Sequence, residues 1–198
     1  MELNPGYATA HHWYGMYLMQ MARHDEAIKE IMLAKELDPI SPRVTTNVGQ
    51  VFFFARQYDR ARETLEKAII KFPDDLNGHL LLGYAYREIS MLDEALAIFQ
   101  SFNFKYEIAL TYAKMGKRNE AIQLLDDLIN KTKQDMVNTY MIACIYFVLG
   151  ENDKGFIWLD KAYQKQENYM TFLKVDPYLD NVREDPRFKA LLKKMNLE

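Results

Sequence analysis

Small and apolar residues recur along the chain in a fixed register, and prolines and acidic residues separate the blocks. Pro5, Pro39 and Pro73 lie 34 residues apart, and the first two close the similar phrases ELNP and ELDP. Because proline cannot continue a helix, each one predicts the end of a helical hairpin and the turn into the next.

Pairs of small residues form a second pattern. In each pair the two residues lie twelve positions apart, as expected where two consecutive antiparallel helices cross closely. The pairs are Gly15 and Ala27, Gly49 and Ala61, Gly83 and Ala95, Ala109 and Ala121, and Ala143 and Gly155.

A third pattern is a polar residue two positions before the second member of each pair, and it predicts helix N-caps. These residues are Asp25, Asp59, Asp93, Asn119 and Asp153. Together the three patterns predict five helix pairs. The first helices are expected near 8–21, 42–55, 76–89, 104–115 and 136–149, and the second near 25–37, 59–71, 93–101, 119–132 and 153–165.

The register breaks once. Successive pairs are separated by 34, 34, 26 and 34 residues, so eight residues are missing between the third and fourth pairs. Eight residues are close to two helical turns, so each apolar face keeps its direction towards the core. We therefore expect an abrupt, aromatic-filled junction between Phe99 and Phe104. At the other end, Leu3 to Pro5 look like the tail of a repeat whose body is absent, which suggests a piece of a longer protein or a lost hairpin.

Residues 167–198 leave the repeat pattern. Asp176-Pro177 and Asp185-Pro186 each place a capping Asp before a Pro at the first helical position. The apolar residues that follow recur at helical spacing: Leu179, Val182, Phe188, Leu191, Leu192 and Met195. This segment is expected to cap the last hairpin, since a terminal repeat has no neighbour to cover it. A detachable docking helix is the alternative.

The first two repeats resemble the tetratricopeptide repeat family. The residues that carry the resemblance are Gly15, Ala27, Ala34 and Pro39, followed by Gly49, Ala61, Ala68 and Pro73. It implies an all-α fold, a right-handed α-solenoid of about five helix hairpins with a C-terminal helical cap. The array would span 1–166, with repeats near 8–41, 42–75, 76–101 (shortened), 102–135 and 136–166, and the cap 167–198.

The resemblance also implies that the first helices line a concave groove that binds a protein or peptide. Partner-binding candidates on that face are His12, Met16, Met19, Gln50, Phe53, Phe54, Leu80, Tyr84, Arg87, Tyr140 and Phe147. The Lys and Asn residues of the family's carboxylate clamp are replaced here by His12, Met16 and Gln50. An apolar or helical ligand, or a flanking domain of the same chain, is therefore favoured. Phe53, Phe54 and Phe147 could instead pack between repeats.

Composition restricts the partners and the location. A formal charge of −3 and a pI near 5.9 argue against nucleic acid as a partner. The longest uncharged stretch, 136–150, is too short for a membrane helix, and the first residues lack the features of a signal peptide. The single Cys144 gives no sign of an oxidising compartment. The predicted location is cytoplasmic.

No pattern in the sequence predicts catalysis. The histidines are not spaced as a metal site, Cys144 lies mid-helix without a nearby His, and there is no phosphate loop or nucleophile elbow. We expect no enzyme activity, no metal and no cofactor.

Two phrases, residues 7–14 and 185–188 with Leu191 and Leu192, resemble the repeat arms of bacterial multidomain signalling proteins. In such proteins the arm follows a winged-helix activator, a nucleotide cyclase or a protein kinase. The predicted function is a protein-interaction scaffold, the sensory or assembly arm of such a protein. The alternative is a homo-oligomerisation module, pairing as a homodimer through exposed aromatic surface.

Overall fold

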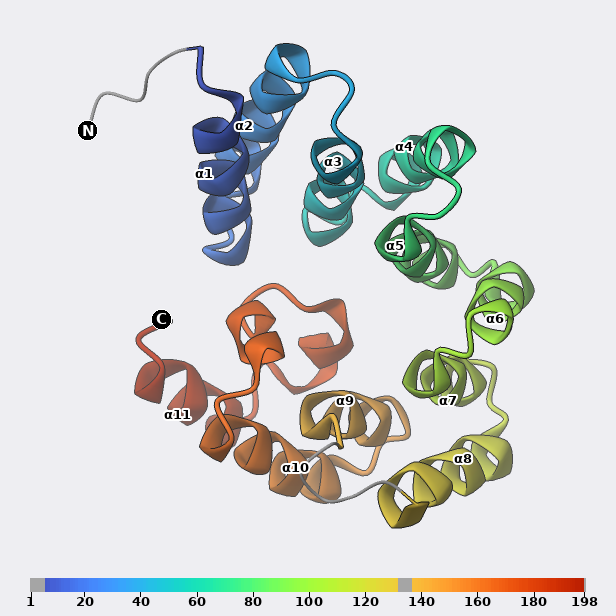
Figure 1. Ribbon diagram of the computed structural model, residues 1–198. Coiled ribbons are helices and arrows are strands. Elements are labelled where there is room, and N and C mark those ends of the chain that lie inside the picture. Colours follow the sequence, from blue (N-terminus) through green and yellow to red (C-terminus); the bar gives the residue numbers. More distant parts are fainter. Residues whose placement is uncertain (1–5, 132–136, 198) are drawn as a thin grey trace. The chain divides into compact units, whose positions relative to one another are not determined.

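The computed structural model describes residues 6–131 and 137–197, and they form helices joined by short turns (Figure 1). No strand occurs in these ranges, which confirms the all-α fold of helix hairpins. The predicted repeat tail at Leu3 to Pro5 lies outside the described residues. The chain divides into two compact units, residues 1–98 and 99–198.

The N-terminal unit holds three hairpins. Their helices are α1 (Ala8–Gln20), α2 (His24–Leu37), α3 (Pro42–Phe54), α4 (Tyr58–Lys71), α5 (Leu76–Glu88) and α6 (Leu92–Ser101), the last of which crosses the unit boundary. Within this unit α3 packs against both α1 and α5, so the first helices of the hairpins lie side by side (Figure 1).

The C-terminal unit holds two hairpins and a closing segment. The hairpins are α7 (Lys105–Lys114) with α8 (Arg118–Lys131), and α9 (Thr139–Val148) with α10 (Asn152–Gln164). The closing segment consists of two 3-10 helices, η2 (Asn168–Phe172) and η3 (Pro177–Val182), and of α11 (Pro186–Lys194).

Each hairpin turns through one residue in the left-handed backbone region. These residues are Ala22, Arg56, Ser90, Gly116 and Gly150, with φ between 61° and 77°. Around each of them two backbone hydrogen bonds close the end of the first helix; at the first turn Arg23 N–H donates to Leu18 and Ala22 N–H to Met19. The five residues repeat the 34, 34, 26 and 34 register of the small-residue pairs.

The predicted N-caps are wrong. Asp25, Asp59, Asp93, Asn119 and Asp153 are each the second residue of their helix. The caps of α2, α4 and α10 are Arg23, Gln57 and Glu151, without side-chain capping bonds. The left-handed turn is so tight that the second helix starts before the acidic residue. The four aspartates still lie in the first turn, where a negative charge is favourable at the positive end of the helix dipole.

Small residues do mark close approaches within hairpins. A Cβ built at Gly15 would lie 3.3 Å from the Ala27 carbonyl oxygen and 3.1 Å from the Ile31 nitrogen. At Gly49 and Gly155 the neighbours are the Leu65 side chain at 2.5 Å and the Phe147 ring at 2.4 Å. The glycine therefore makes room for the neighbour's backbone in the first case and for its side chain in the other two.

The missing eight residues are divided between two helices and the loop that joins them. The α6 helix has 10 residues against 14 in α4, and α7 has 10 against 13 in α5. The loop between them, 102–104, is one residue shorter than the loop 72–75, which accounts for the remainder. In that loop Phe104 packs on Phe102 and Phe99, with ring centroids 5.8 Å and 6.4 Å apart. The expected aromatic junction is confirmed.

The C-terminal segment folds onto α9 and completes the core of its unit. Leu173, Leu179 and Phe188 are fully buried there, and Leu191 and Met195 pack against the same core. Asp176 and Asp185 accept from the backbone N–H groups of Tyr178 and Arg187, so both predicted Asp-Pro caps are confirmed.

Candidate functional site

The predicted binding face of the N-terminal unit lies on α1, α3 and α5. Met16, Gln50, Leu80 and Tyr84 are partly exposed on it. The other candidates in this unit are buried: His12, Met19, Phe53, Phe54 and Arg87. The surface that a partner can reach is therefore narrower than the sequence predicts.

An aromatic cluster supports this face. The Phe53 ring lies 5.2 Å from Phe54, 5.5 Å from Tyr58 and 5.9 Å from Tyr84. The Arg87 guanidinium lies 5.1 Å from the Tyr84 ring centroid, a cation–π distance. Phe53 thus packs between repeats, Phe54 is buried beside it on the same helix, and Tyr84 is held from two sides with part of its surface exposed.

A buried polar contact joins the first two repeats. The Asn47 amide nitrogen lies 2.8 Å from His12 Nε2. Because the amide nitrogen can only donate, His12 accepts through Nε2, and the neutral ring carries its proton on Nδ1. Burial, and secondarily the nearby Arg43 charge, lowers the pKa of His12. The neutral imidazole is thus the form that the fold requires.

In the C-terminal unit the predicted candidates are inside the core. Tyr140 and Phe147 are 0% exposed, as is Cys144. The Tyr140 hydroxyl donates to the buried Asp176 carboxylate over 2.8 Å, and burial raises the pKa of Tyr140 well above its usual range. The prediction that these two side chains face a partner needs correction. Tyr140 is covered by the C-terminal segment, whereas the Phe147 ring packs within its own hairpin, 5.0 Å from the Phe156 ring on α10.

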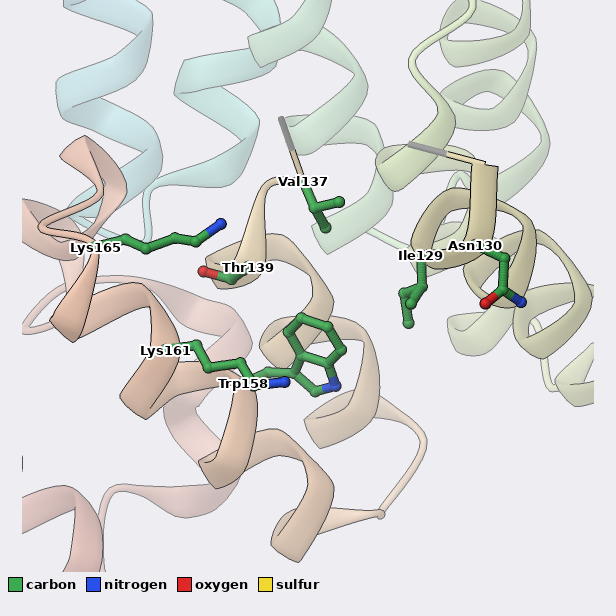
Figure 2. A pocket seen from close by; sticks show the side chains of 7 residues that line it. All are labelled: Ile129, Asn130, Val137, Thr139, Trp158, Lys161 and Lys165. Carbon is green, nitrogen blue, oxygen red and sulfur yellow. The ribbon is translucent and has the colours of Figure 1, made fainter. Parts of the chain in front are cut away.

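Figure 2 shows a pocket of about 420 Å³ in the C-terminal unit that the sequence did not predict. It is lined by Ile129, Asn130, Val137, Thr139, Trp158, Lys161 and Lys165. The Lys161 ammonium lies 3.8 Å from the Trp158 ring centroid. Trp158, Lys161 and Lys165 follow one another at helical spacing along α10 and its C-terminal end, which is the signal that could have identified this surface.

A smaller pocket of about 300 Å³ occupies the corresponding place in the N-terminal unit. The two correspond at a constant offset of 94 residues: Lys35 to Ile129, Thr45 to Thr139, Thr64 to Trp158, and Lys67 to Lys161. In the N-terminal pocket the Lys35 ammonium donates to the Thr45 hydroxyl and to the Pro39 carbonyl. Both pockets lie between the second helices of consecutive hairpins.

A third surface is the outer face of α1. Tyr7, Trp13, Tyr14 and Tyr17 are between 37% and 56% exposed, and the Tyr14 and Tyr17 rings stack with centroids 6.4 Å apart. A cluster of large exposed aromatic side chains is uncommon on a monomer and marks a candidate contact surface.

Within the described ranges no group of three or more His, Cys, Asp or Glu side chains is placed to hold a metal ion. Nor does any helix in these ranges combine the length and the apolarity needed to cross a membrane.

The fold is that of a helical-hairpin repeat protein. Three family models, each described as a tetratricopeptide repeat, match residues 8–41, 49–102 and 105–131. The chain is therefore built from tetratricopeptide repeats. No curated protein matches it by sequence.

Solved structures show the same fold. A thermophilic tetratricopeptide-repeat protein from Thermus thermophilus superposes with a TM-score of 0.66, covering 97% of this chain and 100% of that one, at 16% identity. A crystal structure of MamA gives 0.51, covering 83% and 94%, at 21% identity. YrrB, described as having an unusual peptide-binding site, gives 0.50, covering 86% and 92%, at 21% identity.

Proposed function

We propose that the chain is a protein-interaction scaffold whose N-terminal unit binds a protein or peptide on the face of α1, α3 and α5. Tetratricopeptide repeats generally serve as protein-interaction scaffolds, and YrrB, which shares the fold, has a peptide-binding site. The observation that carries the proposal is the partly exposed Tyr84, backed by Phe53 and Arg87.

Tyr84 has the properties of an interface anchor. Its ring offers apolar area and its hydroxyl offers a polar contact, at a low cost in side-chain entropy. Met16 and Gln50 occupy the equivalent position of the two preceding repeats, at intervals of 34 residues, so one row of side chains crosses the face. Arg87, at 1% exposure, acts from beneath Tyr84 and is not itself a contact residue.

The test compares wild-type protein with Tyr84→Ala in a quantitative pull-down from the source cell's lysate. A specific partner should lose at least about 1 kcal/mol of binding free energy, while the melting temperature stays within a few degrees. Ile70→Ala on α4, at an exposed side chain outside this face, is the matched control and should keep the partner. Survival of every captured partner in Tyr84→Ala would remove this face as the binding site.

Homo-oligomerisation is a second candidate function, and the exposed Tyr14 and Tyr17 stack favours it. Light scattering across a concentration range measures it directly. A mass that rises with concentration in the wild type, and not in a Trp13→Ser, Tyr17→Ser double variant, would support pairing through α1. A monomer at all concentrations would exclude it.

We also propose that the chain is the sensory or assembly arm of a bacterial cytoplasmic signalling protein, with a flanking effector domain as a partner. The support is the resemblance of residues 7–14 and 185–188 to such arms. Sequencing the surrounding gene tests this: an in-frame effector domain upstream agrees with the proposal, and a stop codon directly before Met1 contradicts it.

A further inference from the structure

The pocket of the C-terminal unit combines two kinds of chemistry. Ile129, Val137 and the Trp158 ring supply apolar walls from α8, from the residues just before α9 and from α10 (Figure 2). Lys161 on α10 and Lys165 at its C-terminal end both extend into the pocket in the same view. The pocket therefore offers apolar contacts and positively charged groups close together.

Glu167, two residues after Lys165, has its hydrogen-bond partners on α9. Glu167 accepts hydrogen bonds from the backbone N–H groups of Thr139 and Tyr140, each over 3.0 Å, and from the Thr139 hydroxyl over 2.6 Å. It thereby closes the N-terminal end of α9, where a negative charge is favourable. Glu167 thus fixes Thr139, one wall of the pocket, in position.

The equivalent pocket of the N-terminal unit shows that this chemistry is not a general property of the hairpins. There the lysine at the position of Ile129, Lys35, is bonded within its own unit to Thr45 and Pro39, and Thr64 replaces the indole. In the C-terminal unit the lysine is exchanged for an apolar residue and the threonine for a tryptophan. Both exchanges enlarge the apolar part of the surface beside Lys161.

We infer that this pocket is a second binding site, which takes a segment of protein chain with a carboxylate beside a bulky apolar side chain. The inference is independent of the function proposed for the N-terminal unit. Charge complementarity selects the acidic group, since a carboxylate pairs well with an ammonium that a tryptophan ring holds in place. Ile157, 58% exposed and one turn before Lys161 on α10, extends the apolar surface and favours a chain segment over a small molecule.

The test uses the pocket's own tryptophan as the reporter. The chain has two tryptophans, Trp13 and Trp158, so in Trp13→Phe the remaining tryptophan, excited selectively over the tyrosines, is the one in the pocket. The probe is the blocked peptide acetyl-Gly-Ser-Glu-Asp-Leu-Phe-Ser-Gly-amide, titrated to about 1 mM, where even binding of roughly 4 kcal/mol is detected. We expect a saturable change in Trp158 emission that weakens as salt is raised.

Three comparisons make the result specific. Replacing the two acids of the peptide by Gln and Asn, or its Leu and Phe by Ala, should each weaken binding about tenfold or more. Lys161→Gln with Lys165→Gln should have a similar effect, whereas Lys193→Gln, an exposed lysine of α11 in the same unit, should have none. Tyr84→Ala should leave this titration unchanged, which separates it from the proposed function of the N-terminal unit.

Several outcomes would overturn the inference. No change in Trp158 emission at about 1 mM peptide would do so, as would equal binding of the neutral peptide or an equal loss in Lys193→Gln. So would a response to phosphatidylserine vesicles or to a single-stranded RNA oligomer without a response to the peptide. The formal charge of −3 argues against both the anionic lipid surface and the RNA as partners.

Discussion

One repeat position has opposite environments in the two units. Met16, Gln50 and Tyr84 occupy it in the N-terminal unit, and all three are partly exposed. Leu110 and Cys144 occupy it in the C-terminal unit, and both are 0% exposed. The same helical frame thus leaves a face available to a partner in one unit and covers it from within the chain in the other.

The difference arises from the C-terminal segment, which only one unit possesses. In the C-terminal unit η3 packs on α9, and the Tyr140–Asp176 hydrogen bond joins the two. In the N-terminal unit the chain simply proceeds from one hairpin to the next. The place of a residue in the repeat therefore does not decide whether its side chain is exposed. The segment that packs over it does.

The largest effect is expected from removing residues 167–198. The truncation exposes the apolar face of α9 and removes buried side chains worth about 1.5–3 kcal/mol each. Leu173, Leu179, Val182 and Phe188 are among them, so the loss approaches the typical stability of a whole domain, about 5–15 kcal/mol.

Hydrogen exchange followed by mass spectrometry should show lost protection in α9 and α10. Phe188→Ala is a milder version of the truncation and should lower the free energy of unfolding by about 3–5 kcal/mol. Lys193→Ala on the same helix is the control. A truncated chain that keeps its protection and its melting temperature would show that the segment is no cap, and the docking-helix alternative would gain.

Glycine substitutions test how closely the two helices of a hairpin cross, in one hairpin of each unit. Gly49→Ala would place a Cβ 2.5 Å from Leu65, and Gly155→Ala would place one 2.4 Å from the Phe147 ring. Overpacking of this kind costs about 1–3 kcal/mol. Because an aromatic ring yields less easily than a leucine, Gly155→Ala should cost more, as measured by urea unfolding. A neutral effect at both sites would refute the close crossing.

Acidification should selectively weaken the N-terminal unit. The folded-state pKa of His12 is lowered, so its contribution to stability is present above its unfolded value near 6.5 and is lost as pH falls through the folded value. Protonated Nε2 can no longer accept from Asn47, which costs about 0.5–1.5 kcal/mol.

Chemical unfolding at pH 7.5 and 5.5 measures this loss, in a range above the carboxylate titrations. His12→Gln keeps an acceptor and should reduce the pH dependence. His79→Gln is the control, since His79 Nε2 donates to the Pro73 carbonyl over 2.9 Å and is not an acceptor there. If the free energy of unfolding changed equally between pH 7.5 and 5.5 in wild type and in His12→Gln, the assigned tautomer would be contradicted.

The smallest effect concerns the hairpin turns. Ala22 has a φ of 61°, which costs a non-glycine residue about 1–2 kcal/mol. Ala22→Gly should therefore raise the free energy of unfolding by up to about 1 kcal/mol, after the entropy of the unfolded glycine is subtracted.

The reverse change in the other unit is the matched control. Gly116 has a φ of 73° and open space around its Cβ position, so Gly116→Ala isolates the backbone strain and should destabilise. Calorimetric melting temperatures that move in the same direction for both variants would contradict the explanation.

The hairpin register could be predicted because it depends on local chemistry. Small residues such as Gly15 and Gly155, and the Asp-Pro caps, impose structure wherever they occur. The predicted helix starts at Asp25 and Asp59 are one residue too late. They depend on the left-handed conformation of Ala22 and Arg56, which cannot be predicted from an alanine or an arginine.

The candidate site was harder to predict for a physical reason. The burial of Tyr140 depends on how the C-terminal segment packs on α9. That packing is a contact between residues far apart in the sequence, and a local pattern does not predict it. The pocket of the C-terminal unit was not predicted because its walls come from three separate elements. The helical spacing of Trp158 and Lys161 on α10 is the only part of it that the sequence displays locally.

The central claim, one open face and one covered face, can be tested with thiol reactivity. Cys144 is the only cysteine, and Gln50 is its repeat equivalent. Ellman's reagent should label native Cys144 at least about a hundredfold more slowly than Gln50→Cys in a Cys144→Ser background, since the buried thiol reacts only after local opening. In concentrated guanidinium chloride the two rates should converge. Equal rates in the native state would show that the C-terminal segment does not cover α9 and would contradict the account.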